Sequence, residues 1–397
     1  MIPELRIQFN QRYTPELYRE LQRGLDEVAG THLGFRCSET PVFLPVALVD
    51  KMAQYGQELY QQIANDPEYK KASDATIPGE FNVPGETQHP LFLQADFGLV
   101  RASDGTLEPK LVEIQGFPSI YGFQVAMAHE YMRVYRLKEL DERLTTFLGG
   151  FDDASSEALL RRAILGEHAP EEVVLLEIEP YEQKTLPDFF VTQKLLGIKI
   201  ACITELRKRG RELYTADGTR IKRIYNRVIV DELIRKNIQS EFRLTDDVDV
   251  EWAGHPNWFF RISKFSLPWF RHPCVPETRF LANLETLPDN LEDYVLKPLY
   301  SFAGLGVKIS PSREEIEEIP RDQRAEFILQ RRMDFVPTID TPSGMTKVEV
   351  RIMYIWDGDL KPVTTVIRTG RGKMMGVDFN KNLDWVGASA GFTIRDS

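Results

Sequence analysis

The stretch from Asp96 to Gln115 contains two acidic side chains and an amide whose spacing suits a divalent cation site. It consists of two apolar runs joined at Asp104-Gly105, the pattern of a β-hairpin. A turn centred there places Asp96 opposite Glu113, with Glu113 and Gln115 on one strand face. Opposed carboxylates about 5 Å apart repel each other unless a cation intervenes. We therefore predict Asp96, Glu113 and Gln115 as magnesium ligands; a solvent-facing carboxylate at a sheet edge is the alternative.

A lysine followed by a glycine-containing loop offers groups that bind phosphate. In YVLKPLYSFAGLGVKI, Lys297 ends an apolar strand, and Ser301, Gly304 and Gly306 lie in the loop before the next strand. Glycines let backbone N–H groups approach phosphate oxygens, and the lysine adds a positive charge. The GxxxxGK[ST] pattern is absent, which excludes a Walker-type phosphate loop. An ordinary glycine turn is the alternative.

Charged residues on two adjacent strands form a third group. Glu349, Arg351 and Met353 share one face of VEVRIMYIW, and a turn at Asp357-Gly358 leads into KPVTTVIR. With this turn, Arg368 pairs with Glu349. Arginines on that face suit a phosphoryl group, which a guanidinium binds through two hydrogen bonds. A cross-strand ion pair that only stabilises the sheet is the alternative.

Periodicity and turn signals predict the elements that position these groups. The apolar patterns predict helices over residues 14–28, 45–64 and about 124–147, and residues 66–90 predict a long loop. In the hairpin, parity directs Val112 and Ile114 into the core. From Glu172, VVLLEIE, a helix over 186–196, IKIACI and IKRIYNRVIV predict a small parallel α/β unit. Residues 242–293 give no clear pattern.

The fold class that follows is mixed α/β (α+β), with an antiparallel sheet near the C-terminus. YVLKP, GVKI, FILQRR and the two strands joined at the DG turn predict that sheet. We place domain boundaries so that residues 1–155 hold the N-terminal helices and metal hairpin, 156–285 the parallel α/β unit, and 286–397 the nucleotide-binding portion.

Composition excludes several function classes. The 397 residues carry a formal net charge of -11, which disfavours nucleic-acid binding, and we interpret the cluster of Arg207, Lys208, Arg209 and Arg211 as solvated surface. Three widely spaced cysteines form neither a zinc motif nor a disulfide framework. Scattered histidines and the lack of a GxSxG motif disfavour hydrolase chemistry. Without a membrane-length apolar run or a signal peptide, we expect no membrane partner and a cytoplasmic location.

The order of the three groups resembles the ATP-grasp superfamily. There the lysine strand and glycine loop usually come first, then an adenine-contacting strand, a D-x-R or E-x-R strand, and last the metal hairpin. Here the metal hairpin comes first. This order resembles the circularly permuted branch that contains eukaryotic glutathione synthetase and glutathionylspermidine synthetase. The resemblance implies an ATP-grasp fold with a preceding substrate-side α/β domain.

The resemblance also implies ATP and Mg²⁺ as cofactors and assigns roles to residues. Asp96, Glu113 and Gln115 match the metal ligands, and Lys297 with Ser301–Gly306 matches the phosphate contacts. Leu329-Gln330 match the segment that meets adenine, Glu349 and Arg351 the D-x-R position, and Arg368 the arginine for the transferred phosphoryl group. The tail MMGVDFNKNLDWVGASAGF is similar to the segment that closes the site, with Asn380 and Asn382 as polar contacts.

The implied activity is ligation of a carboxylate to an amine through an acyl phosphate, on small molecules or peptides. We expect these substrates near the loop Gly116–Gly122 and around Arg227 and Asp231, and we leave a homodimer open. A catalytically weak ATP-binding sensor or assembly protein is the alternative, since Gln115 stands where the family has Asn and Arg331 where a hinge acid is common. A third hypothesis is an α/β protein of unrelated activity whose turns are ordinary.

Overall fold

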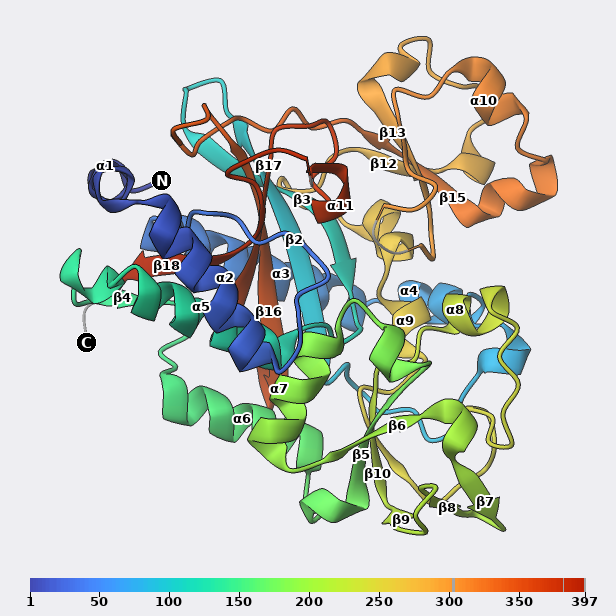
Figure 1. The fold of residues 1–397 in the computed structure, drawn as a ribbon. Helices are drawn as coiled ribbons and strands as arrows, with labels where there is room; N and C mark the ends of the chain where they lie inside the picture. The colour runs from blue at the N-terminus through green and yellow to red at the C-terminus, as the bar shows by residue number, and fades with distance from the viewer. Residues whose placement is uncertain (302–303, 381, 396–397) are drawn as a thin grey trace.

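A large sheet crosses the centre of the molecule (Figure 1). The computed structural model describes residues 1–301, 304–380 and 382–395. The strand order is β1-β18-β17-β16-β2-β3, with β4 paired to β18. The strands are β1 (Val42–Phe43), β2 (Phe92–Arg101), β3 (Leu107–Gln115), β4 (Leu144–Thr145), β16 (Lys347–Asp357), β17 (Asp359–Gly370) and β18 (Gly387–Ile394). Strands from the two ends of the chain therefore pair side by side in one sheet.

The β2–β3 hairpin pairs Asp96 with Glu113, as the turn predicted. Next to this pair the register shifts by one residue, because Phe97 pairs with Leu111 and Val112 is left without a partner. Such a bulge turns the extra residue away from its regular direction. The prediction that Val112 points into the core is therefore wrong, since Val112 lines a cavity, whereas Ile114 is buried as predicted.

The β16–β17 hairpin pairs Glu349 with Arg368, again as predicted. Its register also shifts by one residue, between Met353 and Tyr354, so that Val363 is the extra residue. Antiparallel pairing of β16 with β2 places Arg351 opposite Asp96. The two hairpins thus put their charged residues side by side in the middle of the sheet.

Different helices cover the two faces of this sheet. Helix α3 (Val46–Ala64) packs its apolar side on the face that carries Phe97 and Ile352. Helices α2 (Pro15–Ala29) and α5 (Tyr121–Val134) pack with Phe392 of β18 on the other side. The bounds of α2 and α3 confirm two predicted helices. The helix predicted over 124–147 ends early, because Tyr135 and the left-handed Arg136 lead into a turn before β4.

Two four-stranded sheets lie beside the large one (Figure 1). The antiparallel sheet β12-β15-β13-β14, called the small sheet below, consists of β12 (Thr278–Phe280), β13 (Tyr294–Pro298), β14 (Lys308–Ile309) and β15 (Phe327–Arg331). The parallel sheet β11-β10-β5-β6 consists of β5 (Val173–Glu177), β6 (Lys199–Cys202), β10 (Arg223–Asn226) and β11 (Glu251–Ala253). Helix α7 (Leu186–Leu196) connects β5 to β6, as predicted. The mixed α+β class and the parallel unit are confirmed.

The remaining elements are short or peripheral. The helices are α1 (Pro3–Arg12), α4 (Pro67–Asp74), α6 (Asp153–Leu165), α8 (Val230–Arg235), α9 (Trp258–Arg261), α10 (Arg313–Glu317) and α11 (Val377–Asn380), and the strands are β7 (Arg207–Arg209), β8 (Glu212–Tyr214) and β9 (Arg220–Ile221). Helix α4 falls within the predicted loop 66–90, and α6 begins at the predicted boundary near residue 155. The domain boundaries themselves stay predictions.

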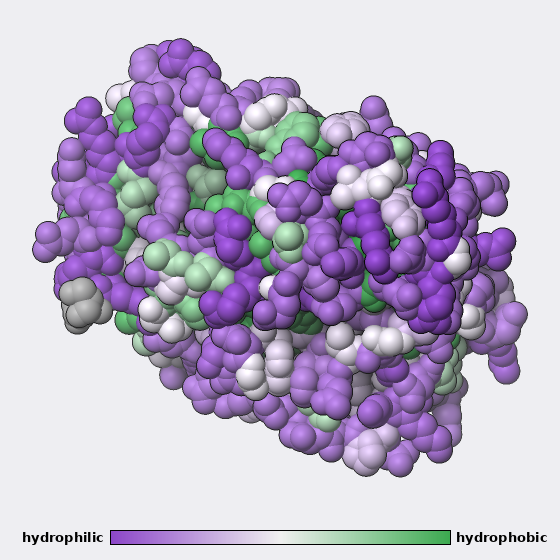
Figure 2. Space-filling model, turned by 90° about the horizontal axis from the view of Figure 1, so that it is seen from below, coloured by the Kyte–Doolittle hydropathy of each residue, from purple (hydrophilic) through white to green (hydrophobic). Residues whose placement is uncertain are grey.

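The surface agrees with the composition. Figure 2 shows one face as mainly hydrophilic, with apolar residues in separate groups. In the predicted surface cluster, Lys208 Nζ lies 2.7 Å from Asp246. The cysteines are buried. None of the helices in the part of the chain that the structure describes has the length and apolar character of a bilayer span.

Candidate functional site

A cavity of about 1100 Å³ lies between the large sheet, the small sheet and the carboxyl ends of the parallel strands. Most of the predicted site residues line it, namely Asp96, Glu113, Gln115, Lys297, Gly304, Gln330, Glu349, Arg351 and Arg368. Among the described lining residues, twelve lysines and arginines face eight acids, although the whole chain carries a net charge of -11. The cavity therefore suits an anionic ligand.

Two arginines bind the Asp96 carboxylate. Arg351 donates from Nε to Oδ1 at 2.5 Å and from Nη2 to Oδ2 at 2.7 Å, and Arg368 Nη1 donates to Oδ2 at 3.0 Å. Asp96 is fully buried, which by itself would raise its pKa, but Arg351 and Arg368 hold the pKa below its usual range. Guanidinium groups thus relieve the repulsion for which we predicted a metal ion.

Glu349 is the second buried acid of this group. It accepts a short hydrogen bond from Arg368, its cross-strand partner. Burial raises the pKa of Glu349, and repulsion from Asp96 and Glu113 adds to the effect, whereas Arg368 opposes it. Arg368 therefore bridges two acids, and its own pKa is raised by them despite burial.

Glu113 and Gln115 also line the cavity, and their side-chain oxygens accept fewer hydrogen bonds than those of Asp96. The Glu113 side chain is 24% exposed, and its carboxylate lies 3.4 Å from Lys264 Nζ and 3.7 Å from Arg351 Nη2. Gln115 donates from Nε2 to Gln94 Oε1 at 2.5 Å, which directs its own amide oxygen elsewhere. Two oxygen donors on one strand remain available to a hard cation.

Lys297 joins the small sheet to the large one. Its Nζ donates to Val112 O at 3.0 Å and to Gln330 Oε1 at 2.6 Å. The first acceptor is the carbonyl of the bulged residue of β3. Burial lowers the pKa of Lys297 to about 8, with Lys264 adding to the shift and Glu113 opposing it.

Lys264 is a cavity residue that the sequence did not reveal. Its Nζ lies 3.4 Å from Glu113 and donates to the backbone oxygen of Ser301 at 2.5 Å. It falls in the stretch 242–293, where no periodicity predicted an element. Only its contact with two predicted residues identifies it, and that contact requires the fold.

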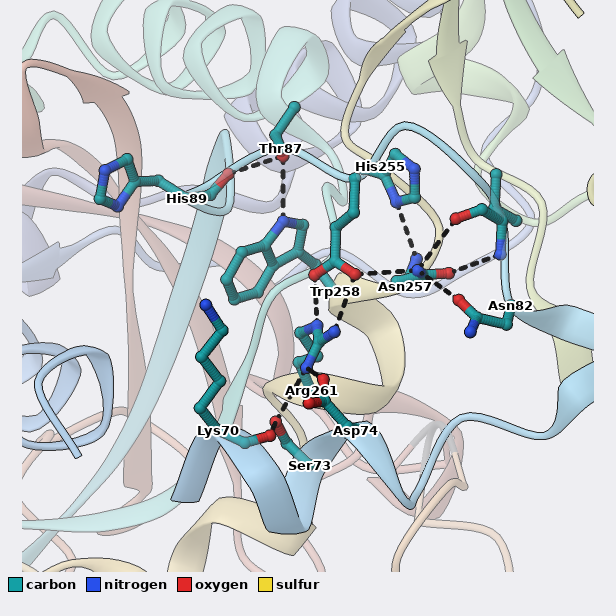
Figure 3. A network of polar contacts seen from close by, with 12 residues as sticks. Lys70, Ser73, Asp74, Asn82, Thr87, His89, His255, Asn257, Trp258 and Arg261 are labelled. Atoms are coloured by element: carbon teal, nitrogen blue, oxygen red, sulfur yellow. Dashed lines mark hydrogen bonds and ion pairs between the residues drawn. The ribbon is translucent and has the colours of Figure 1, made fainter. Parts of the chain in front are cut away.

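A polar network fixes the chain just before Lys264 (Figure 3). Asn257 donates from Nδ2 to Asn82 Oδ1 at 3.0 Å, to Val83 O at 3.1 Å and to Glu86 Oε2 at 2.9 Å. Arg261 forms ion pairs with Glu86 and with Asp74, the latter at 2.6 Å. The network therefore anchors α9 to the segment 74–89.

The same stretch is also bound to the β2–β3 hairpin. Gly116 N donates to Ile262 O at 2.9 Å. A Cβ at Gly116 would lie 2.9 Å from the backbone oxygen of Trp258, so no larger residue fits there without a shift. Together with the polar network, this contact positions Lys264 beside Glu113.

Several predicted contacts lie outside the cavity. Ser301, Gly306 and Leu329 are not among the described lining residues, and the loop 301–306 falls partly outside the part of the chain that the structure describes. The Leu329 side chain packs into the core of the small sheet, because strand alternation turns it away from Gln330. Any role in adenine contact would therefore fall to its backbone.

The predicted asparagine contacts are corrected by the fold of the tail. Asn380 is buried and binds backbone only, accepting from Arg371 N at 3.1 Å and Gly372 N at 3.2 Å and donating to Met374 O at 2.9 Å. It shapes the segment 371–380, whose residues Lys373 to Phe379 line the cavity. Asn382 is exposed and is not among the described lining residues.

The parallel sheet contributes the far wall of the cavity. Glu177 ends β5 and lines the cavity, and burial raises its pKa to about 8, only partly opposed by Arg227. Arg227 follows β10, lines the cavity and is bound by the fully buried Asp188. Asp188 also accepts from Gly122 N at 2.9 Å, so the predicted substrate loop and Arg227 meet at this acid. Asp231 is not among the described lining residues.

The donors present fit a magnesium ion only with help from a ligand. Among the described residues, no group of three or more His, Cys, Asp or Glu side chains could hold a metal. Glu113 and Gln115 supply two oxygens, while both Asp96 oxygens are engaged by arginines. Magnesium is often held by one or two carboxylates together with nucleotide phosphates, and this donor set matches that arrangement.

Comparison with known proteins shows the fold. No family model matches the chain. No curated protein matches it in sequence either. A solved glutathione synthetase-like effector from Globodera pallida, in its apo form, matches with a TM-score of 0.59 and 11% identity over 96% of this chain and 98% of that chain. The likeness shows a shared fold over nearly all of the chain.

Proposed function

We propose that this chain is an ATP- and magnesium-dependent carboxylate–amine ligase of the circularly permuted ATP-grasp type. The observation that carries the proposal is the shared cavity, to which the small sheet brings Lys297 and Gln330 and the large sheet brings Glu113, Arg351 and Arg368. The fold of the glutathione synthetase-like neighbour supports it. The excess of basic lining residues matches the charge of a nucleoside triphosphate.

The proposed reaction has two steps. A substrate carboxylate oxygen bonds to the γ-phosphorus of ATP, the β–γ P–O bond breaks, and ADP leaves. An amine nitrogen then bonds to the acyl carbon, the C–O bond to phosphate breaks, and the amine loses a proton. Such phosphoryl transfer needs positioning and charge stabilisation rather than a protein nucleophile.

The side chains have distinct parts in this scheme. Lys297 and Lys264 bind phosphate oxygens, while Arg351 and Arg368 stabilise the charge that develops on the transferred group. Asp96 holds the two arginines in place through the hydrogen bonds described above. Glu113 and Gln115 hold magnesium, which neutralises phosphate charge when bound.

A catalytically weak ATP-binding protein is the second candidate. The engagement of Asp96 by two arginines favours it, because among the described hydrogen bonds only Glu113, of the two predicted carboxylate ligands, accepts none from an arginine. A sensor needs to bind the nucleotide but does not need to orient it for transfer.

Nucleotide binding and turnover separate these functions. Mg-ATP at a hundredfold excess over its dissociation constant stabilises a binding protein by about 2.7 kcal/mol, which a thermal-shift assay detects. Lys297→Met should remove this stabilisation, whereas Lys361→Met at the tip of the β16–β17 hairpin is the matched control. ADP release that requires a fractionated metabolite pool supports the ligase. Nucleotide binding without such release supports the sensor, and no binding at all rejects both.

A further inference from the structure

Four exposed apolar side chains lie at the edge of the cavity. Tyr181, Ile234, Leu305 and Phe379 are 57–62% exposed, more than any other large hydrophobic residue in the described part of the chain. We call them the apolar rim. Each belongs to a short segment whose neighbouring residues line the cavity, namely Glu182, Arg235, Gly304 and Asp378.

Contacts between neighbouring residues connect the segments that carry the rim side chains. Lys184 Nζ lies 2.8 Å from Asp378 Oδ2, which joins the segment after Tyr181 to α11. Gln183 donates to Glu232 at 3.1 Å, which joins the same segment to α8. A Cβ at Gly304 would lie 3.6 Å from the Phe379 ring, so the glycine loop reaches α11 as well.

The clustering is what calls for an explanation. Single exposed apolar residues are normal on a protein surface, and Ile7 and Met345 are examples outside the cavity lining. Apolar side chains gathered beside a cavity mark the place where a ligand or partner binds. The rim adjoins the lining of the proposed substrate cavity, so one ligand that extends out of that cavity can contact both.

The charged residues around the rim and its exposed area limit which kind of ligand can bind there. Acids and bases alternate with the rim residues, including Glu182, Lys184, Glu232 and Lys236, and this mixture disfavours a purely apolar acyl chain. Four such side chains expose roughly 400–500 Å², whereas a stable interface with a second copy of the chain needs ~800 Å² on each partner. A peptide offers apolar side chains together with polar backbone and charged ends.

We propose that one substrate of the ligase is a peptide of several residues, whose reacting end enters the cavity and whose remaining residues cross the apolar rim. This inference rests on the proposed function for the reaction at the buried end. The contacts at the rim provide peptide binding that is separable from turnover. Free amino acids and dipeptides offer fewer side chains than a longer peptide to occupy both the cavity and the rim, so we expect them to bind more weakly.

Binding of defined peptide pools tests this proposal. Equilibrium dialysis with mass spectrometry, in the presence of magnesium and a non-hydrolysable ATP analogue, compares a random-sequence hexapeptide pool with a random dipeptide pool. We expect at least about tenfold greater retention of hexapeptides. A double variant, Tyr181→Ser with Ile234→Ser, should lose this preference, because neither side chain is among the described lining residues yet both belong to the rim. Ile7→Ser with Met345→Ser is the matched control.

Four kinds of outcome at the rim overturn the proposal. Equal retention of both pools, or an unchanged preference in the rim variant, excludes a peptide as the ligand of the rim. Displacement of the pool by octanoate assigns the rim to an acyl chain. Light scattering that shows a dimer for the wild type and a monomer for the rim variant assigns it to a second copy. A loss of Mg-ATP binding in the rim variant assigns it to nucleotide closure. Absence of Mg-ATP binding in every protein, including the wild type, instead defeats the proposed function while peptide retention is still measured.

Discussion

The large-sheet wall and the parallel-sheet wall of the cavity hold their buried acids in opposite ways. On the large sheet, Asp96 and Glu349 are each bound by arginine, and strand register fixes all of these partners. On the parallel sheet, Glu177 is buried with a hydrogen bond from Ile178 N and no ion pair among the described residues. Arg227 beside it is bound by Asp188 instead.

The difference shows which buried carboxyl groups are bound by an arginine and which one is not. Two arginines hold the pKa of Asp96 below its usual range, and Arg368 opposes the rise that burial causes in the pKa of Glu349. The pKa of Glu177 is raised by burial with only partial opposition from Arg227. The large-sheet wall is therefore a preformed set of charges for one kind of ligand. The parallel-sheet wall holds a carboxyl whose charge depends on pH and on what lies next to it.

The largest effect should follow from breaking the paired wall. Arg351→Met leaves the Asp96 carboxylate with one arginine in a buried site and should lower the free energy of unfolding by about 3–5 kcal/mol. Urea denaturation followed by circular dichroism measures the change. Addition of Asp96→Leu to this variant should recover much of the loss. A change below about 1 kcal/mol would show that the pairing matters little.

Removal of the buried acid in the parallel-sheet wall should raise stability instead of lowering it. Because the pKa of Glu177 is raised from 4.5 to about 8, the folded chain keeps a proton that the unfolded chain has lost, and stability falls as pH rises through this window. Glu177→Gln should remove this dependence of stability on pH. At pH 8 its free energy of unfolding should be higher than that of the wild type by roughly 2–3 kcal/mol. Stability curves that stay parallel for the two proteins would contradict the contrast between the walls. Glu179→Gln is the control.

Lys297 sharpens the comparison because it contacts the large sheet from a third wall. Its pKa is lowered to about 8, so the unfolded chain binds more protons than the folded chain between about pH 8 and 10.5. Stability should therefore rise with pH in that window, and Lys297→Met should abolish the rise. Affinity for Mg-ATP should fall in the wild type above pH 8 and be about tenfold weaker in the variant, measured by calorimetry. An unchanged pH profile would separate Lys297 from the nucleotide.

The smallest effect is expected for an ion pair outside the cavity. Arg162 Nη2 lies 3.0 Å from Asp357 Oδ2, and both side chains are more than half exposed. Arg162→Ala should change the free energy of unfolding by less than about 0.5 kcal/mol in the same urea assay. A larger loss of stability would mean that burial does not explain why the Asp96–arginine pairs contribute more than this exposed pair.

Turn chemistry made the charged pairs predictable. Asp104-Gly105 and Asp357-Gly358 located two hairpins closely enough to pair Asp96 with Glu113 and Glu349 with Arg368. The bulges were not predictable, since no residue type marks the extra valine. That is why the direction of Val112 was wrong.

Other parts of the site needed tertiary information. Lys264 follows a short helix held by Asn257 and Arg261, and their partners lie about 170 or more residues away along the chain. No local pattern reports such contacts. Asn380 looked like a ligand contact because its polarity was visible in the sequence, but its hydrogen bonds to the backbone of its own loop were not.

The bulge at Val112 has a consequence for how the sheets are coupled. It frees the Val112 carbonyl, which accepts a hydrogen bond from the Lys297 ammonium, and Gln330 accepts a second one. An ammonium has three N–H groups, so within the described contacts one is left to grip a ligand oxygen. The nitrogen atom that connects the two sheets is thus also the one that we propose binds the nucleotide, and its chemical shift would respond to both contacts.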